Sequence, residues 1–226
     1  MTPPREAAPD WYAARTLTRL LGLAFWRMRA YGTRNVPARG GVLVAATHQS
    51  FLDPPLVGSA IPRPSCFMAR SDLFRFGPFG AVIRRLHAFP VRQGGADRGA
   101  IDGAIALLRE GRCLIIFPEG GRTRDGRVAP IQQGFSLVAR RAGVPIVPAR
   151  VWGTFRAWPW FQPLPRPSRV AVAFAPPLDM SLDRAGLVEG LRAAWDDLGR
   201  LLGPEPRVRA SRLARALQRR ASVPDR

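Results

Sequence analysis

Short apolar runs alternate with helical patterns along most of the chain. Each run is bounded by glycine, proline or polar residues, as expected of strands buried in a sheet. The predicted strands are residues 41–47, 65–70, 87–91, 113–117, 145–151 and 169–174. Between the third and the fourth strand, apolar residues at helical spacing over 101–108 predict a helix that Gly111 ends. Strands that alternate with helices predict a single α/β domain, with a mixed, largely parallel sheet flanked by helices.

Residues 11–30 carry the pattern of an amphipathic helix. Its apolar face holds residues 17, 20, 21, 24, 25 and 28, with Arg15, Arg19 and Arg29 lying away from it. The longest apolar stretch, residues 20–26, is far shorter than the roughly 20 residues that a membrane-spanning helix needs. Two compatible interpretations stay open, because such a helix can lie in a bilayer interface or cover the core of its own domain. We assign residues 1–35 to this N-terminal, membrane-associating helix.

A second long helix is predicted near the C-terminus. Ser181 can cap its start, and the Gly-Pro pair at 203–204 can end it. The α/β domain then spans residues 36–204 and includes an exposed loop, rich in proline and arginine, at 153–168. Residues 205–226 form a basic tail or helix, which either touches anionic lipid headgroups or stays solvated. The apolar side of the predicted helix consists of Leu187, Leu191, Trp195, Leu198 and Leu202.

The composition indicates anionic partners. The 226 residues suit one globular domain, and the chain has a net charge of +19 with arginine as its only basic residue besides two histidines. Such an excess attracts nucleic acid, anionic lipid or acidic carrier proteins. Cys66 and Cys113 lie in apolar runs and are expected to be buried free thiols in a reducing compartment. Because the first residues show no cleavable secretory signal, we expect a peripheral or monotopic protein at the cytoplasmic face of the cell membrane.

Residues with catalytic chemistry follow the first predicted strand. The segment HQSFLD places His48 at the strand exit and Asp53 five residues later. A loop that turns into a helix can bring the two side chains together. A neutral imidazole can take a proton from a hydroxyl, and a carboxylate on its other nitrogen would orient the ring and stabilise the imidazolium. At these residue frequencies the HxxxxD spacing arises by chance about one time in ten, so it needs independent support.

A second cluster, FPEGGRTR at residues 117–124, follows the apolar run CLII. Glycines let backbone amides approach a ligand, and paired arginines offer planar donors to phosphate oxygens, so the cluster predicts an anion site. The alternative is a surface turn with solvated arginines. Between the two clusters, the strand exit FPVR carries Arg92.

The order HQSFLD, FPVR, FPEGGR and VPIVP, over residues 40–150, resembles the glycerophosphate and lysophosphatidate acyltransferase family. Four ordered motifs are far more specific than any one of them. The resemblance implies an O-acyltransferase that uses acyl-CoA or acyl carrier protein as acyl donor and needs no further cofactor. It implies a lysophospholipid acceptor, with 1-acylglycerol-3-phosphate as the first candidate, and a place in phospholipid biosynthesis.

The same resemblance implies roles for individual residues. His48 would be the general base and Asp53 its orienting partner. The proton would leave the acceptor hydroxyl as its oxygen attacks the thioester directly, because neither Ser50 nor Ser136 lies in the GxSxG pattern of a covalent nucleophile. The segment VPIVP would shape the pocket wall. The substrate pocket would be organised by Arg92, Glu119, Gly120, Gly121 and Arg122.

Three departures from the family pattern bear on the acceptor. Thr47 stands where asparagine is frequent, Gly121 stands where the pattern FPEGTR has threonine, and Gln132 stands where lysine is common. The loss of a lysine near a phosphate site weakens the case for lysophosphatidate. A different lipid acceptor therefore stays an alternative.

A nucleic-acid-binding protein is the alternative from another class, given the charge and the aromatic residues near 152–161. The arginines are dispersed and no RRM, KH or zinc-finger signature is present, so we expect no nucleic-acid partner. A non-catalytic membrane-binding relative is disfavoured because both His48 and Asp53 are retained. The histidines and cysteines match no compact zinc pattern, so we expect no metal.

Overall fold

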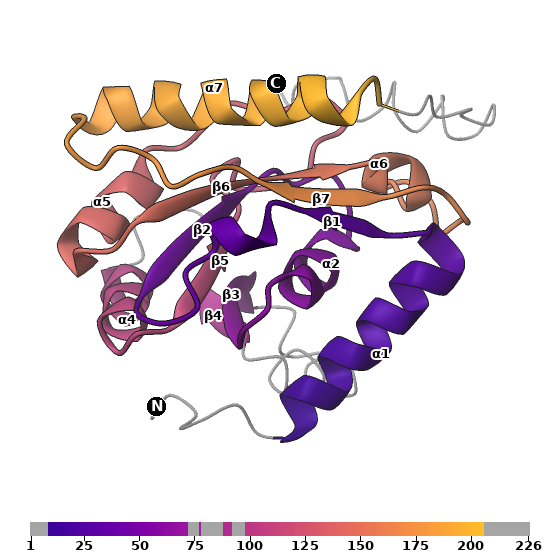
Figure 1. Ribbon diagram of the computed structural model, residues 1–226, viewed down its shortest axis with the longest axis horizontal. Coiled ribbons are helices and arrows are strands. Elements are labelled where there is room, and N and C mark those ends of the chain that lie inside the picture. The colour runs from indigo at the N-terminus through magenta and orange to yellow at the C-terminus, as the bar shows by residue number, and fades with distance from the viewer. Residues whose placement is uncertain (1–8, 72–76, 78–87, 92–97, 206–226) are drawn as a thin grey trace, which may run out of the picture.

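The computed structural model describes residues 9–71, 77, 88–91 and 98–205, which form a seven-stranded sheet with helices on both faces (Figure 1). The strand order is β1-β7-β6-β2-β5-β3-β4, and each neighbouring pair is parallel except β6 with β7. The predicted α/β class and largely parallel sheet are confirmed. The strands are β1 Arg29–Tyr31, β2 Val42–Ala46, β3 Ser65–Arg70, β4 Ala88–Val91, β5 Cys113–Ile116, β6 Ile146–Trp152 and β7 Ala171–Phe174.

The central strand β2 is buried on both faces. Val42 and Val44 pack into the core on one side of the sheet, and Leu43 and Ala45 pack into the core on the other. A strand enclosed in this way reads as a continuous apolar run, which is why the sequence predicts it well. The chain leaves β2 at the edge of the sheet where its parallel strands end. On either side of β2, β5 and β6 run parallel to it.

The pattern misses one strand and places the others to within one or two residues. β1 has only three residues, all exposed, so it carries no apolar signal. It nevertheless pairs in parallel with β7 at the edge of the sheet. His87, the first residue of one predicted strand, lies outside the described residues.

Helices cover the sheet from two sides. In Figure 1, α7 lies along one face, whereas α1 and α2 lie on the opposite face. The helices are α1 Pro9–Trp26, the short 3-10 helix η1 Thr33–Asn35, α2 Asp53–Ala60, α4 Arg98–Arg109, α5 Gly134–Ala142, α6 Thr154–Ala157 and α7 Arg184–Leu202. The predicted helix between the third and fourth predicted strands corresponds to α4, which the pattern places three residues too late at its start.

The cap of α7 differs from the prediction. Asp183, and not Ser181, is the residue that precedes the first turn, and its Oδ1 accepts a hydrogen bond of 2.7 Å from the backbone amide of Gly186. Both residue types cap helices well, so two neighbouring candidates cannot be separated by type alone. The end of the helix at Gly203 agrees with the prediction, and Trp195 is fully buried in its apolar stripe.

The segment 153–168 is only partly the exposed loop that the sequence predicts. It begins with α6, whose residues Thr154, Phe155 and Ala157 are buried. Residues 163–167 are exposed, as expected. The buried part lies against the loop after β2, because the hydroxyl of Ser50 donates a hydrogen bond of 2.7 Å to the carbonyl of Trp158.

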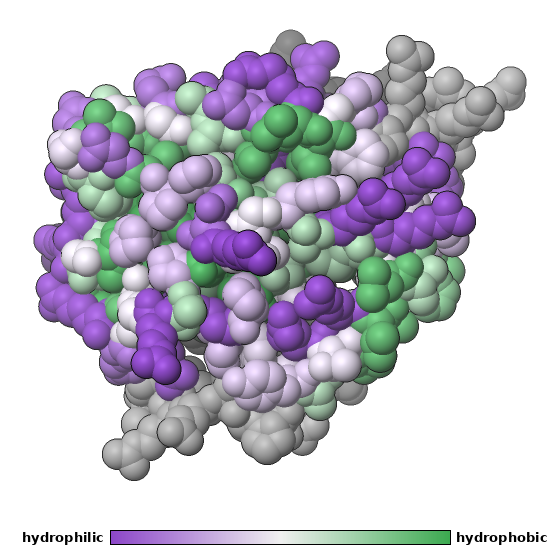
Figure 2. All heavy atoms as spheres, in the orientation of Figure 1, coloured by the Kyte–Doolittle hydropathy of each residue, from purple (hydrophilic) through white to green (hydrophobic). Residues whose placement is uncertain are grey.

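The helix α1 packs on α2 along one narrow side. Trp11 and Gly22 are buried there, and Arg15 Nε donates a hydrogen bond to the carbonyl of Ile61 at the end of α2. Part of the opposite side is visible as a hydrophobic patch at the lower right of Figure 2. Within the described residues, no helix combines the length and the apolar character that crossing a bilayer would require. The large apolar side chains exposed on α1 are Tyr12, Leu17, Leu20, Leu21, Leu23 and Phe25.

Candidate active site

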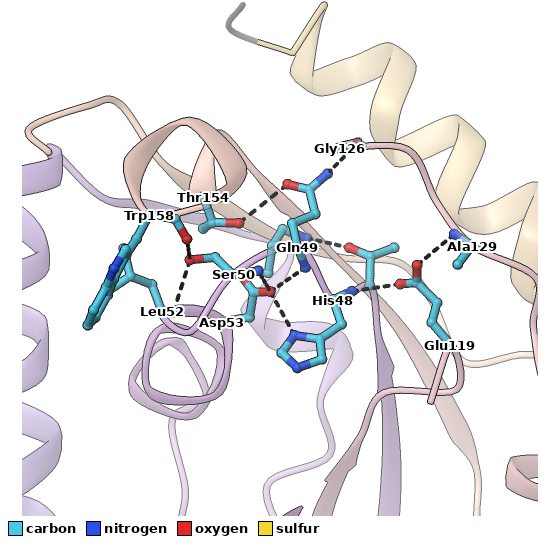
Figure 3. Close-up of polar contacts among 12 residues, drawn as sticks. His48, Gln49, Ser50, Leu52, Asp53, Glu119, Gly126, Ala129, Thr154 and Trp158 are labelled. Carbon is cyan, nitrogen blue, oxygen red and sulfur yellow. Dashed lines mark hydrogen bonds and ion pairs between the residues drawn. The ribbon is translucent and has the colours of Figure 1, made fainter. Parts of the chain in front are cut away.

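His48 stands where the chain leaves β2, and its side chain meets Asp53. Its Nδ1 lies 2.9 Å from Oδ2 of Asp53 (Figure 3). The pairing of β2 with β6 continues through Thr47, whose amide bonds the carbonyl of Ala149, so the imidazole follows the last paired residue. The structure therefore brings together the two residues that the HxxxxD spacing predicts.

Asp53 is held by the start of the helix that it begins. It is the first residue of α2, and its Oδ2 also accepts hydrogen bonds from the backbone amides of Gln49 at 2.5 Å and Ser50 at 2.7 Å. The carboxylate thus lies at the positive end of the helix dipole and satisfies two backbone amides that precede the helix. Because the side chain is fully buried, its orientation toward His48 is fixed.

The contact with Asp53 occupies Nδ1 of His48 and leaves Nε2 available to a substrate. A carboxylate only accepts hydrogen bonds, so in the neutral imidazole the contact places the proton on Nδ1 and leaves the lone pair on Nε2. The ring stacks on Phe117, with ring centroids 4.2 Å apart and planes inclined by 24°. The side chain of His48 keeps 16% of its surface exposed, so a substrate can approach it. This arrangement suits a general base, because Asp53 orients the ring through Nδ1 while Nε2 is left for the substrate.

The loop after β5 holds both backbone groups of His48. Oε1 of Glu119 accepts a hydrogen bond of 2.6 Å from the amide of His48, and the amide of Thr123 donates one of 2.9 Å to its carbonyl. The second oxygen of Glu119, Oε2, accepts a bond of 2.7 Å from the amide of Ala129. Burial raises the pKa of Glu119 to about 7. The buried Glu119 thus joins the loop after β2 to the loop after β5, because its two carboxylate oxygens accept one backbone amide from each.

The other residues predicted for the pocket lie in the same loop, with one exception. Gly120 has a positive φ of 72°, and a Cβ placed on it would stand 2.3 Å from Nε2 of Gln132. Gly121 is exposed with open space around its Cα. The half-buried Arg122 places its guanidinium 3.4 Å from the ring centre of Phe51, beside the HQSFLD segment. Arg92 lies outside the described residues.

A set of polar residues that the sequence does not reveal surrounds Gln49. Its buried Nε2 lies 3.3 Å from both the carbonyl of Gly126 and Oε1 of Glu205, and its Oε1 accepts a hydrogen bond from Thr154 Oγ1 at 3.3 Å. Oε2 of Glu205 accepts a bond of 2.8 Å from the amide of Gly153. Gln49 therefore ties the loop after β2 to the loops after β5 and β6 and to the end of α7.

The side chains that could form a covalent acyl intermediate are engaged or buried. The Ser50 hydroxyl donates to the carbonyl of Trp158, and the Ser136 hydroxyl donates to the carbonyl of Gln133. Burial raises the pKa of both Cys66 and Cys113 to about 12, and the two cysteines are unpaired, as predicted. Among the described residues, no group of three or more histidine, cysteine and acidic side chains is placed to hold a metal ion.

Comparison with known proteins gives a consistent result. A family model described as Acyltransferase matches residues 27–152. The 1-acyl-sn-glycerol-3-phosphate acyltransferase of Bacillus subtilis is 33% identical over 127 residues, which are 56% of this chain and 63% of that protein. The enzyme of the same name from Streptococcus pneumoniae is 29% identical over 169 residues, which are 72% of this chain and 61% of that protein.

The fold has a counterpart among solved structures. A crystal structure of the 1-acyl-sn-glycerophosphate (LPA) acyltransferase PlsC from Thermotoga maritima superposes with a TM-score of 0.73 and 25% sequence identity. The match covers 86% of this chain and 81% of that chain. By contrast, the sequence match covers less than two thirds of the Bacillus and Streptococcus relatives.

Proposed function

Because the chain belongs to the Acyltransferase family, we propose that it is an O-acyltransferase that moves a fatty acyl group onto the hydroxyl of a lysophospholipid. The donor would be acyl-CoA or acyl carrier protein, and the first candidate acceptor is 1-acylglycerol-3-phosphate, in phospholipid biosynthesis. The observation that carries the proposal is the 2.9 Å contact between His48 and the buried Asp53, which leaves Nε2 as a base at an accessible edge. The names of the Bacillus and Streptococcus relatives support the acceptor.

The proposed reaction is a direct transfer. Nε2 of His48 takes the proton of the acceptor hydroxyl while the hydroxyl oxygen bonds to the thioester carbonyl carbon. The carbon–sulfur bond then breaks, and the thiolate leaves with the proton that the imidazolium returns. Asp53 stabilises the imidazolium between the two proton transfers. General-base assistance contributes about 10²- to 10⁴-fold, so positioning of the two substrates has to supply the remainder.

The acceptor phosphate would bind at the loop after β5. Arg122 offers a planar set of donors beside the HQSFLD segment, and the exposed Gly121 leaves room for a ligand to approach the backbone. In the proposed site, Arg92 would add a second cation. Glu119 would act beneath this pocket, since both of its carboxylate oxygens accept backbone amides.

A different lipid acceptor is the alternative substrate. Gln132 stands next to the glycine turn, where a lysine is common in the family, and it places a neutral amide against Gly120. A phosphate at this turn would therefore meet one cation fewer. An acceptor whose headgroup needs fewer cations, such as another lysophospholipid or a hydroxylated lipid, would tolerate glutamine in place of this lysine.

We also propose that the protein works at an anionic membrane surface, at the cytoplasmic face of the cell membrane and in a peripheral or monotopic position. The support comes from α1, whose exposed side carries Leu17, Leu20 and Phe25, each more than half exposed. An apolar stripe of this kind gains free energy when it enters the interface of a bilayer. The net charge of +19 adds attraction to anionic lipids.

A single incubation experiment tests the reaction and the acceptor. Purified protein is mixed with labelled acyl-CoA or labelled acyl carrier protein and a panel of lysolipids, and new esters are separated and identified. We expect a diacyl product whose formation disappears in His48→Ala. Vesicle binding of His48→Ala is measured in parallel to show that the variant is folded. Equal turnover by the parent protein and His48→Ala would overturn the proposal.

A further inference from the structure

A groove of about 940 Å³ lies on the α7 face of the sheet, next to the edge strand β1. It exists because α7 packs on β6 and β7 and leaves the side chains of β1 exposed. Its floor is apolar and belongs to a small separate part of the core, in which Ala173 of β7 packs with Leu198 of α7. The imidazole of His48 points away from α7 in Figure 3, so the groove is separate from the candidate active site.

Three arginines line one end of this groove: Arg27, Arg29 and Arg169. In the register of the sheet, Arg29 of β1 stands opposite Ala171 of β7. Arg27 lies two positions before Arg29, and Arg169 lies two positions before Ala171. Within the described part of the chain, none of the three guanidinium groups has an ion pair or a side-chain hydrogen bond. The groove therefore presents uncompensated positive charge.

The acidic residue in the described lining does not offset these arginines. Asp197 accepts a hydrogen bond from Arg200, which lies three residues later on α7. Large apolar side chains on both sides of the groove extend into solvent: Leu201 of α7 is 83% exposed and Tyr31 of β1 is 47% exposed. The groove thus combines cations at one end with apolar surface along its length, which is the complement of an anionic amphiphile.

We propose that this groove binds the headgroup and upper acyl chain of an anionic phospholipid within a bilayer. The lipid phosphate would lie against the three arginines, and the chain would follow Leu198 and Leu201. The groove would be a second membrane contact beside α1, so the inference rests on the proposed association with a membrane. Its volume falls within the roughly 300–1,000 Å³ typical of small-molecule binding sites.

The position of the groove favours a bilayer over an acidic protein. Arg27 follows directly on α1, whose last turn exposes 55% of Phe25, so the cations begin where the apolar stripe of α1 ends. Figure 2 shows one hydrophobic patch over α1 and another beneath the C-terminal half of α7, with hydrophilic surface between them.

Vesicle binding with matched charge changes tests the proposal. The variant Arg27→Gln/Arg29→Gln/Arg169→Gln is compared with Arg140→Gln/Arg184→Gln/Arg192→Gln, in which three exposed arginines elsewhere are neutralised. Both variants lose the same formal charge. With vesicles of phosphatidylcholine and phosphatidylglycerol, we expect about a hundredfold weaker binding for the groove variant, or about fivefold per arginine, and a change of only a few fold for the control.

Three outcomes of this comparison would overturn the proposal. Equal losses in both variants would mean that only diffuse charge acts. An unchanged affinity in the folded groove variant would exclude a headgroup site. A groove variant that binds vesicles normally but no longer binds purified acyl carrier protein would assign the groove to a protein partner. Circular dichroism of both variants shows whether they are folded, and His48→Ala separates this test from the proposed reaction, because its vesicle binding should equal that of the parent.

A fluorescent probe tests the location independently of charge. Since Cys66 and Cys113 are buried, a cysteine introduced at Leu201 can be labelled selectively with an environment-sensitive dye. Leu182→Cys, in the turn before the other end of α7, is the control. We expect a blue shift on addition of anionic vesicles for the label at position 201 and a much smaller one at position 182. A label at position 201 that shows no shift would contradict insertion of the groove rim into a bilayer.

Discussion

Glu205, three residues beyond α7, hydrogen-bonds Gln49, the residue next to His48. The two side chains are separated by 156 positions in the chain, and Nε2 of Gln49 lies 3.3 Å from Oε1 of Glu205. Burial raises the pKa of Glu205, and its second oxygen holds the amide of Gly153. The C-terminal end of α7 is therefore part of the support of the proposed base.

Replacement of Glu205 by glutamine tests this support. A glutamine has only one acceptor oxygen for the two hydrogen bonds that the carboxylate accepts, and its amide group would face a donor. We expect kcat to fall about tenfold through a less well placed His48, with little change in KM. Activity assays and thermal unfolding of Glu205→Gln are compared with those of Glu189→Gln, an exposed position on α7. If kcat is retained in a folded Glu205→Gln protein, Glu205 has no role in positioning.

The variant Asp53→Asn tests the orientation of His48. Asparagine keeps the size of the side chain but removes the negative charge that stabilises the imidazolium. We expect kcat to fall by about 10²- to 10⁴-fold, because the wrong tautomer of His48 becomes accessible. Asp102→Asn, on the exposed side of α4, is the matched control and should retain its rate. A similar kcat for both variants would exclude Asp53 from the mechanism.

The variant Glu119→Gln tests the pH dependence of stability. Burial raises the pKa of Glu119 from its ordinary value near 4.5 to about 7, so the folded protein binds this proton more tightly than the unfolded chain does. The resulting stabilisation is fully present below pH 4.5 and is lost as the pH rises through about 7. Glutamine at this position does not titrate.

Denaturant unfolding of the parent and of Glu119→Gln at several pH values measures this effect. The stability advantage of the parent over the variant should shrink by at most about 3 kcal/mol between pH 4.5 and pH 7. The loss of one hydrogen bond in the variant adds a constant difference that does not depend on pH. A difference that stays the same over this range would show that Glu119 titrates normally.

Gly120 and Gly121 form a matched pair for the glycine turn. Gly120→Ala introduces a Cβ at a positive φ and close to Gln132, whereas Gly121→Ala meets open space at an ordinary φ. We expect Gly120→Ala to lower the free energy of unfolding by about 1–2 kcal/mol and Gly121→Ala to change it by less than about 0.5 kcal/mol. The double variant Gly120→Ala/Gln132→Ala relieves the contact but keeps the backbone strain, so it should recover only part of the loss. Equal stability of the two single variants would contradict the conformation of this turn.

The sequence predicts the parts of this fold that are buried on both sides. The strand β2 is an unbroken apolar run because helices cover both faces of the sheet. The exposed three-residue strand β1 has no such signal, since its place depends only on pairing with β7. Residue type alone cannot distinguish Ser181 from Asp183 as the cap of α7, whereas the hydrogen bond from the amide of Gly186 to Asp183 does.

In the candidate site, too, the sequence predicts local contacts and misses those that depend on the folded sheet. His48 and Asp53 are five residues apart, so one turn of chain brings them together and the motif alone predicts the contact. Glu205 reaches Gln49 only after the whole sheet has formed, and nothing in the local sequence marks it. The hydrogen bonds of Glu119 are equally hidden from the local sequence, because the loops that carry the amides of His48 and Ala129 meet only in the folded protein.

The two hydrogen bonds from the loop after β5 to the backbone of His48 have a consequence for selectivity. They hold the backbone of His48 against the loop that carries the glycine turn and Arg122, whose guanidinium packs on Phe51, and so limit the separation between the imidazole and that guanidinium. In the proposed reaction, an acceptor can react only if its hydroxyl stands at that same separation from its phosphate. Regiochemistry would then be set by a built-in length in the protein, whereas the acyl chains could vary without moving the reacting atoms.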